Sequence, residues 1–127
     1  MQGEWPCDTV EANKATLAAI RDIDGPVITL QERAPKPVVT KLNTPYQYGF
    51  ANIIRYTGRQ PEFVDAFETS LSTDWSGAGA DIAIVACGSP ISEAMRAAVI
   101  LKETKGRETT VVNLHTQKPL VKTGLLK

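Results

Sequence analysis

The sequence has a single histidine, two cysteines and no excess of charge of either sign. Its 127 residues include fourteen Lys and Arg and fourteen Asp and Glu, and neither sign forms a block. A basic patch is the electrostatic requirement for binding nucleic acid or an anionic membrane surface, so neither is an expected partner. A small molecule or another protein is the partner that this composition favours.

Metal-binding and membrane-spanning patterns are also missing. Cys7 and Cys87 lie far apart, and Cys87 ends an apolar run in which a thiol packs as a small hydrophobic group. No apolar run is long enough for a membrane helix, and the N-terminal residues do not have the pattern of a signal peptide. We therefore expect reduced cysteines and a soluble, cytoplasmic protein.

Residues 8–30 have the pattern of a helix followed by a strand. Asp8 and Glu11 have the spacing of a capping box, in which Asp8 accepts from an amide of the first turn and Glu11 reaches back. The helix ends before Gly25, and the β-branched run 27–30 predicts a short buried strand, which together make half of a parallel α/β unit. The apolar residues on the expected inner face of the helix are Val10, Leu17, Ile20 and Ile23.

The middle of the sequence predicts little regular structure. Three prolines between residues 34 and 45 remove backbone donors and indicate an extended linker between domains. Residues 48–56 alternate loosely enough for a strand, with Phe50, Asn52 or Ile53 facing inward. Residues 57–80 are interpreted as an insertion. It contains a short helix after Pro61 that carries Phe63, Val64 and Phe67, and then an exposed loop anchored by Trp75.

Residues 81–114 predict a strand, a helix and a second parallel strand. The run 81–87 is almost entirely apolar, which is typical of a strand covered on both faces. Ser89 is the expected helix cap and Pro90 suits the first helical position, while Gly106 ends the helix. A buried strand follows at 109–114. The expected inner face of the helix consists of Ile91, Ala94, Met95, Ala98 and Leu101.

Two parts of the sequence resemble the transketolase family. The stretches 6-PCDTVEANKATLAAI-20 and 25-GPVITLQERAPKPVV-39 are similar to the end of its pyrimidine-binding domain. The stretches 81-DIAIVACGSPISEAMRAAVILKE-103 and 111-VVNLHTQKPL-120 are similar to the start of its C-terminal domain. The resemblance implies an α/β chain with partial doubly wound parallel sheets. Two incomplete domains, at 1–33 and 47–127, would be joined by a Pro-rich linker at 34–46. The strand at 109–114 would pair with a further parallel strand that this sequence does not encode, as in a fragment or partial subunit.

The resemblance also implies a function. Family enzymes use thiamine diphosphate and a divalent cation, Mg or Ca, to transfer two-carbon ketol units between sugar phosphates. The family's Gly-Asp-Gly run for metal and diphosphate is not in this sequence, so the chain alone is expected to bind no cofactor and to be inactive. A homodimer or pairing with a separate catalytic subunit is implied. Other origins stay open: a β-subunit-like part of a 2-oxoacid dehydrogenase E1 component or of a deoxyxylulose phosphate synthase, or a non-catalytic docking or dimerisation module.

Arg33 is the candidate site residue. It matches the family arginine that binds the substrate phosphate, a role that suits a guanidinium fork, although Glu32 beside it could pair with it and weaken phosphate binding. His115 is interpreted as a structural residue, because no Cys, Asp or second His accompanies it at the end of its strand. The turn at 88–90 resembles a phosphate-cradling helix start, but in the family this turn holds no cofactor. No catalytic residue or metal ligand is expected.

Overall fold

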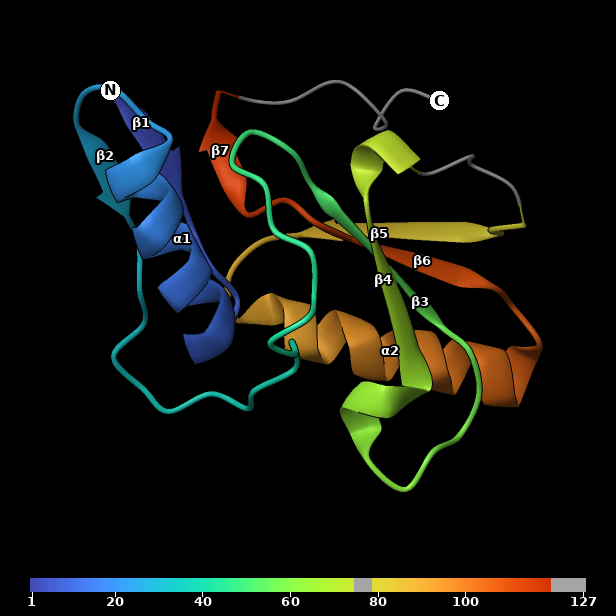
Figure 1. The fold of residues 1–127 in the computed structure, drawn as a ribbon. Helices are drawn as coiled ribbons and strands as arrows, with labels where there is room; N and C mark the ends of the chain where they lie inside the picture. Colours follow the sequence, from blue (N-terminus) through green and yellow to red (C-terminus); the bar gives the residue numbers. More distant parts are fainter. Residues whose placement is uncertain (75–78, 120–127) are drawn as a thin grey trace.

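The computed structural model of the chain describes residues 1–74 and 79–119. These residues form two small sheets, two α-helices and two short 3-10 helices, so the fold is mixed α/β as the sequence predicts. The elements in chain order are β1 (Gln2–Glu4), α1 (Thr9–Arg21), β2 (Val27–Thr29), β3 (Asn52–Tyr56), η1 (Phe63–Ala66), β4 (Phe67–Leu71), η2 (Ser72–Asp74), β5 (Ile82–Ala86), α2 (Pro90–Lys105), β6 (Thr109–Asn113) and β7 (Thr116–Lys118) (Figure 1).

Strand β1 is the centre of a three-stranded sheet with the order β2-β1-β7. It runs parallel to β2, with Gly3 opposite Ile28, and antiparallel to β7, with Gly3 opposite Lys118. Because α1 connects β1 to β2, the N-terminal residues form a complete βαβ unit and not the half unit expected from the sequence. The sequence Gln-Gly-Glu contains no residue with a strong strand preference, and β1 forms because it has a partner on each side.

The second sheet has the order β4-β3-β6-β5. Its inner strand β6 is parallel to β5 and antiparallel to β3, so that Val111 lies opposite both Ile84 and Ile54. The expectation that β6 needs a further parallel strand is therefore wrong, because β3 already occupies that edge. The sheet is mixed, and the predicted purely parallel arrangement is wrong for the same reason.

Helix α2 covers one face of the four-stranded sheet (Figure 1). Ile91, Met95 and Ala98 are at most 1% exposed and pack in one cluster with Val111. The helix begins at Pro90 and ends at Gly106 in a left-handed conformation, both as predicted. Within the described ranges, no helix is long and apolar enough to cross a membrane.

The opposite face of this sheet is only partly covered. Val112 and Ile53 are buried there, but Val85 on the edge strand β5 is 58% exposed. The prediction that β5 is covered on both faces is therefore wrong: Ile84 packs against the α2 cluster, while its neighbour Val85 points to the other side.

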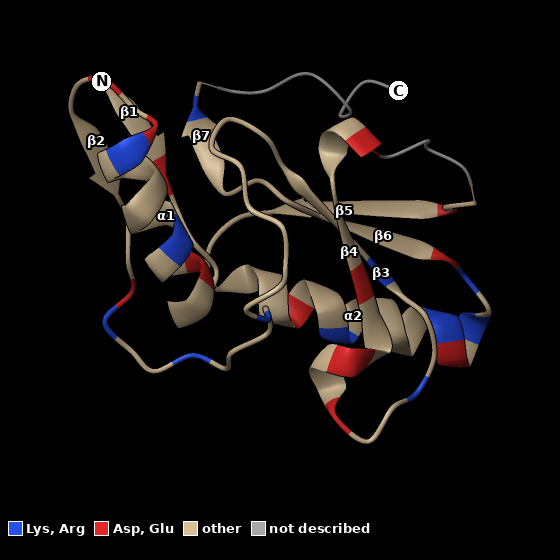
Figure 2. Cartoon of the chain, in the orientation of Figure 1, with Lys and Arg blue, Asp and Glu red and all other residues tan. Residues whose placement is uncertain are grey.

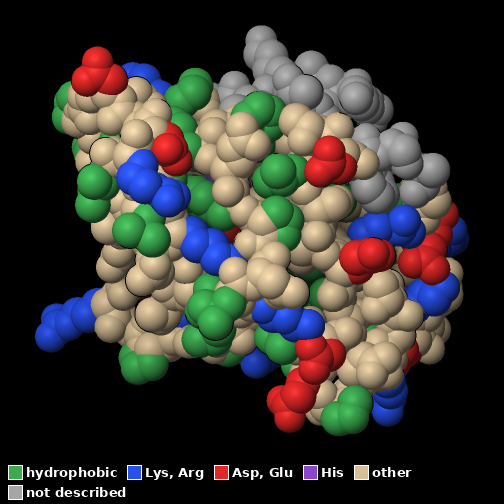
Figure 3. Space-filling model, in the orientation of Figure 1, with side chains coloured by type: hydrophobic (Ala, Val, Ile, Leu, Met, Phe, Trp, Pro, Cys, Tyr) green, Lys and Arg blue, Asp and Glu red, His purple; other side chains and the backbone are tan. Residues whose placement is uncertain are grey.

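Helix α1 follows Asp8 as predicted, but it buries a different face. Leu17 is 47% exposed and Ile20 is 74% exposed, so the predicted apolar inner face is wrong. The side chains that face the protein are Glu11, Ala15 and Ala18. Small alanine side chains let the helix pack closely, which leaves larger apolar side chains on the surface over α1 (Figure 3).

The segment between β2 and β3 contains no helix or strand. It is fixed to the N-terminal unit by Lys14, whose ammonium donates to the carbonyl oxygens of Lys41 and Thr44 at 2.7 and 2.6 Å. That residues 34–46 are a linker between domains stays a prediction.

Residues 57–74 contain regular structure, and the interpretation of 57–80 as an insertion stays a prediction. The predicted short helix is present as the 3-10 helix η1, with Phe63 and Val64, but Phe67 begins strand β4. β4 pairs with β3 along its whole length and forms one edge of the sheet. The expected anchor Trp75 lies outside the described residues.

The N-terminal unit packs against the four-stranded sheet where β5 meets α2. Gly88 in this turn is buried at φ 67°, and a Cβ atom on it would lie 2.6 Å from Trp5 Nε1. The Trp5 amide also donates to the carbonyl oxygen of His115 at 2.7 Å. The absence of a side chain at residue 88 is therefore what lets the Trp5 indole lie against the turn.

Candidate functional site

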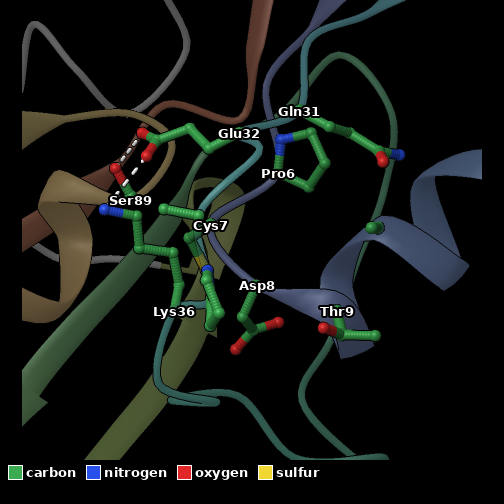
Figure 4. A pocket seen from close by; sticks show the side chains of 11 residues that line it. Pro6, Cys7, Asp8, Thr9, Gln31, Glu32, Lys36 and Ser89 are labelled. Carbon is green, nitrogen blue, oxygen red and sulfur yellow. Dashed lines mark hydrogen bonds and ion pairs between the residues drawn. The ribbon is translucent and has the colours of Figure 1, made fainter.

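The turns that follow β1, β2 and β5 meet around a cavity of about 200 Å³. Residues 6–9 line it from the start of α1, Ser89 lines it from the start of α2, and residues of the segment 31–36 close it (Figure 4). Crevices at the carboxyl ends of strands are the usual ligand sites of α/β folds. Arg33 belongs to this segment, and its neighbours Glu32 and Ala34 line the cavity.

Asp8 holds the start of α1 and the segment near residue 40 together. Its Oδ1 accepts from the Glu11 amide at 2.8 Å, as the predicted cap requires. Its Oδ2 accepts from the amides of Val39 and Thr40 at 2.8 and 2.7 Å. Both carboxylate oxygens are engaged with the backbone, so the geometry gives Asp8 a structural role.

Glu11 reaches back past the capping residue. Its Oε2 accepts from the Cys7 amide at 2.7 Å, one residue earlier than a capping box requires, and its Oε1 accepts from Asn113 Nδ2 at 2.8 Å. Burial raises the pKa of Glu11. Burial, followed by the nearby Glu11 charge, raises the pKa of the free Cys7 thiol, so Cys7 is not a reactive thiolate.

Glu32 is engaged by residues that sequence reasoning did not connect with it. The Ser89 hydroxyl donates to Glu32 Oε1, and the Lys36 ammonium lies 3.0 Å from Oε2 (Figure 4). The Ser89 hydrogen bond, and then Lys36, lower the pKa of Glu32. The predicted capping bond from Ser89 is not made in α2, and the anticipated pair between Glu32 and Arg33 is replaced by these contacts.

Arg33 is exposed, and the structure records no hydrogen bond or ion pair between its side chain and any residue in 1–74 or 79–119. Along its segment, Glu32 is followed by the basic residues Arg33, Lys36 and Lys41 (Figure 2). An exposed guanidinium beside a cavity can bind an anion with two parallel hydrogen bonds. The phosphate-binding role of Arg33 stays a prediction.

His115 is fully buried and stacks on Tyr46, with ring centroids 4.4 Å apart. Its Nε2 lies 3.1 Å from Asn52 Oδ1, and its Nδ1 lies 3.1 Å from the Thr116 hydroxyl. Asn52 Nδ2 donates to the carbonyl oxygen of Pro45, so Asn52 Oδ1 faces the ring and Nε2 carries the proton. Burial lowers the pKa of His115 to about 4, which keeps the ring neutral near pH 7. This geometry agrees with a structural histidine.

Glu4 is a buried carboxylate that sequence reasoning missed. It is 0% exposed and accepts hydrogen bonds from the hydroxyls of Thr29 at 2.8 Å and Tyr46 at 2.9 Å. Burial, and then the Glu4 charge, raise the pKa of Tyr46. No local signal could identify Glu4, because its partners come from distant segments. Its contacts hold β1, β2 and the segment before β3 together.

The residues described do not fit thiamine diphosphate and its metal ion. In the ranges 1–74 and 79–119, no group of three or more His, Cys, Asp or Glu side chains could hold a metal ion. The cavity is lined by Asp8, Glu32 and one lysine, and Arg33 is not among its lining residues. Neither observation supports binding of the cofactor by these residues.

Comparison with known proteins shows a similarity in the C-terminal part of the chain. The family described as "Transketolase, C-terminal domain" matches residues 73–127. The match includes the predicted unit of strand, helix and strand, which the structure confirms as β5, α2 and parallel β6. The resemblance of this part to the transketolase C-terminal domain is therefore confirmed.

A solved structure extends the likeness in fold. The chain described as "Split gene transketolase, inactive beta4 tetramer" is similar with a TM-score of 0.67 and 24% sequence identity. The similarity covers 94% of this chain and 32% of that chain, so the present chain spans about a third of its length. No curated protein matches the sequence. The assignment of residues 1–33 to a pyrimidine-binding domain stays a prediction.

Proposed function

We propose that this chain is part of a transketolase-like, thiamine diphosphate-dependent enzyme that transfers two-carbon ketol units between sugar phosphates. The observation that carries the proposal is the match of the transketolase C-terminal domain to residues 73–127. The shared fold over 94% of the chain supports it. The chain contributes structure and one substrate contact, and the remaining machinery belongs to other parts of the enzyme.

The substrate contact is Arg33. It lies in the segment that follows β2, exposed and beside a cavity, where a sugar phosphate can approach. A guanidinium suits a phosphate dianion because its donors match two phosphate oxygens at once. Arg33 orients the substrate by its phosphate and takes no part in bond making.

The cofactor and its cation, Mg or Ca, are assigned to other parts of the enzyme. Thiamine diphosphate supplies the carbanion chemistry when it is bound. We expect titration calorimetry of this chain with thiamine diphosphate and magnesium to show no saturable heat, because the described residues offer no metal site. Micromolar binding would contradict this assignment.

The partner is a second copy of the chain or a separate catalytic subunit. The similar solved structure is described as a tetramer, which supports assembly. Leu17 and Ile20 on α1 add exposed apolar surface that an assembly could cover.

The test uses the full-length gene product that contains this sequence. Arg33→Ala is expected to raise KM for phosphorylated sugars by roughly 10- to 150-fold, because a hydrogen bond to a charged group contributes about 1.5–3 kcal/mol. Donors without phosphate should be nearly unaffected. Arg21→Ala, at the exposed end of α1, is the matched control and should change neither KM.

Each outcome has a distinct meaning. Equal losses for phosphorylated and unphosphorylated donors would make Arg33 a structural residue. Thiamine-dependent activity on 2-oxoacids without ketol transfer would favour the 2-oxoacid dehydrogenase alternative, and condensation of pyruvate with a triose phosphate would favour the deoxyxylulose phosphate synthase alternative. An assembly without thiamine-dependent activity would favour the docking module.

A further inference from the structure

Glu32 and Arg33 are adjacent and carry opposite charges, yet they do not pair. The Glu32 carboxylate accepts from the Ser89 hydroxyl and from the Lys36 ammonium (Figure 4). The Arg33 side chain, by contrast, has no recorded partner among the described residues. The carboxylate nearest to Arg33 along the chain is therefore engaged elsewhere.

The two partners hold different oxygens of Glu32. Lys36 lies four residues along the same exposed segment and contacts Oε2. Ser89 lies 57 residues away, at the start of α2, and donates to Oε1. A serine at this position commonly caps its helix, but Ser89 makes no side-chain capping bond, so its hydroxyl is available to Glu32.

We propose that Ser89 and Lys36 are positioning residues that hold the Glu32 carboxylate away from Arg33 and so keep the guanidinium available to a phosphate-bearing ligand. The inference rests on the proposed function and deepens it. Ser89 thus links the four-stranded sheet to the segment that carries Arg33.

A released Glu32 would compete directly with phosphate. A carboxylate and a phosphate both present paired oxygens that match the guanidinium fork. The carboxylate is the next residue in the chain, so its effective concentration near Arg33 is high even when the pair itself is weak. The larger the fraction of molecules in which Arg33 pairs with Glu32, the lower the apparent affinity of Arg33 for phosphate.

The experiment measures binding of inorganic phosphate by the whole chain, followed through the Arg33 Nε–H signal in NMR spectra of ¹⁵N-labelled protein. Ser89→Ala removes one donor without changing the net charge, and we expect it to weaken phosphate binding roughly two- to fivefold. Adding Lys36→Met should weaken it further. Glu32→Gln in the Ser89→Ala background should restore the lost affinity.

The decisive comparison is a double-mutant cycle. Glu32→Gln removes one negative charge in every background, so its general electrostatic effect cancels. Our inference requires a larger gain from Glu32→Gln in the Ser89→Ala background than in the wild type. Equal gains in the two backgrounds would overturn it.

Controls separate this inference from the proposed function. Ser89→Thr keeps a hydroxyl and should bind phosphate like the wild type, while Lys105→Met removes a lysine at the far end of α2 and should show only the general loss of charge. Arg33→Ala has no Nε–H signal, so its phosphate binding is compared with that of the wild type through the backbone amide signals of Glu32 and Ala34 in both proteins. If Arg33→Ala binds phosphate as well as the wild type, the proposed role of Arg33 fails and this inference fails with it. If Arg33→Ala weakens binding but Ser89→Ala does not, this inference alone fails.

Discussion

Gly88→Ala tests the contact between the N-terminal unit and the four-stranded sheet. The new Cβ would lie 2.6 Å from Trp5 Nε1 and 2.7 Å from Cε2, which is closer than real Cβ contacts allow. An L-residue in the left-handed region costs about 1–2 kcal/mol, and displacing a packed side chain costs about 1–3 kcal/mol more. We expect a loss of roughly 2–5 kcal/mol in the free energy of unfolding.

Gly106→Ala is the matched control. Gly106 has nearly the same φ, 65° against 67°, but an added Cβ would meet nothing within 4 Å. The backbone cost and the change in the unfolded chain are therefore common to both variants. Their difference isolates the collision with Trp5, and it should be about 1–3 kcal/mol.

Urea unfolding at low micromolar concentration, followed by far-UV circular dichroism, measures both variants. In a Trp5→Ala background the extra cost of Gly88→Ala should disappear, because the colliding ring is gone. Equal losses for Gly88→Ala and Gly106→Ala would refute the argument and show that the indole moves aside without cost.

Three further predictions concern other described residues. The imidazole of His115, the only histidine, should titrate near pH 4 in NMR spectra; an inflection near 6.5 would contradict its burial. Because the unfolded chain takes up a proton on His115 below pH 6.5 and the folded chain does not, the free energy of unfolding should fall by about 3 kcal/mol between pH 6.5 and 4. This loss should be absent in His115→Gln. Asp8→Ala should cost roughly 2–4 kcal/mol in urea unfolding, since a cap and charged hydrogen bonds are lost, whereas exposed Asp22→Ala should cost little. The isolated chain should self-associate in light scattering, and Leu17→Lys with Ile20→Lys should reduce this; unchanged association would implicate another surface.

The elements predicted best are those whose signals are local. α2 has a proline at its start, a glycine at its end and an inner face of apolar residues, and all three signals agree with the structure. The helical start at Asp8 was also predictable, because the cap and its amide donor lie three residues apart. Helix-start and helix-end signals involve residues only a few positions apart, so they can be recognised in the sequence itself.

The elements missed depend on partners that are distant in sequence. β1 is too short to show a pattern, and β4, with the sequence Phe-Glu-Thr-Ser-Leu, lies in a stretch interpreted as helix and loop, so both are defined by the strands beside them. The inner face of α1 consists of alanines and Glu11, which hydrophobic periodicity does not rank above Leu17. At the site, Arg33 is a candidate by resemblance and stays a prediction, whereas the hydrogen bond between Glu32 and Ser89 spans 57 residues and could not be predicted.

The position of β1 between β2 and β7 affects the order in which the chain can fold. β1 can pair with β2 once β2 itself has been made, but Glu4 pairs with Thr116, which is made much later. The edge of β1 that pairs with β7 is therefore open from the synthesis of β2 until β7 has been made, and closing such a long loop adds an entropic cost that slows this pairing. During that interval the exposed edge of β1 can pair with another nascent copy, so chaperone binding to the N-terminal residues would favour the native product.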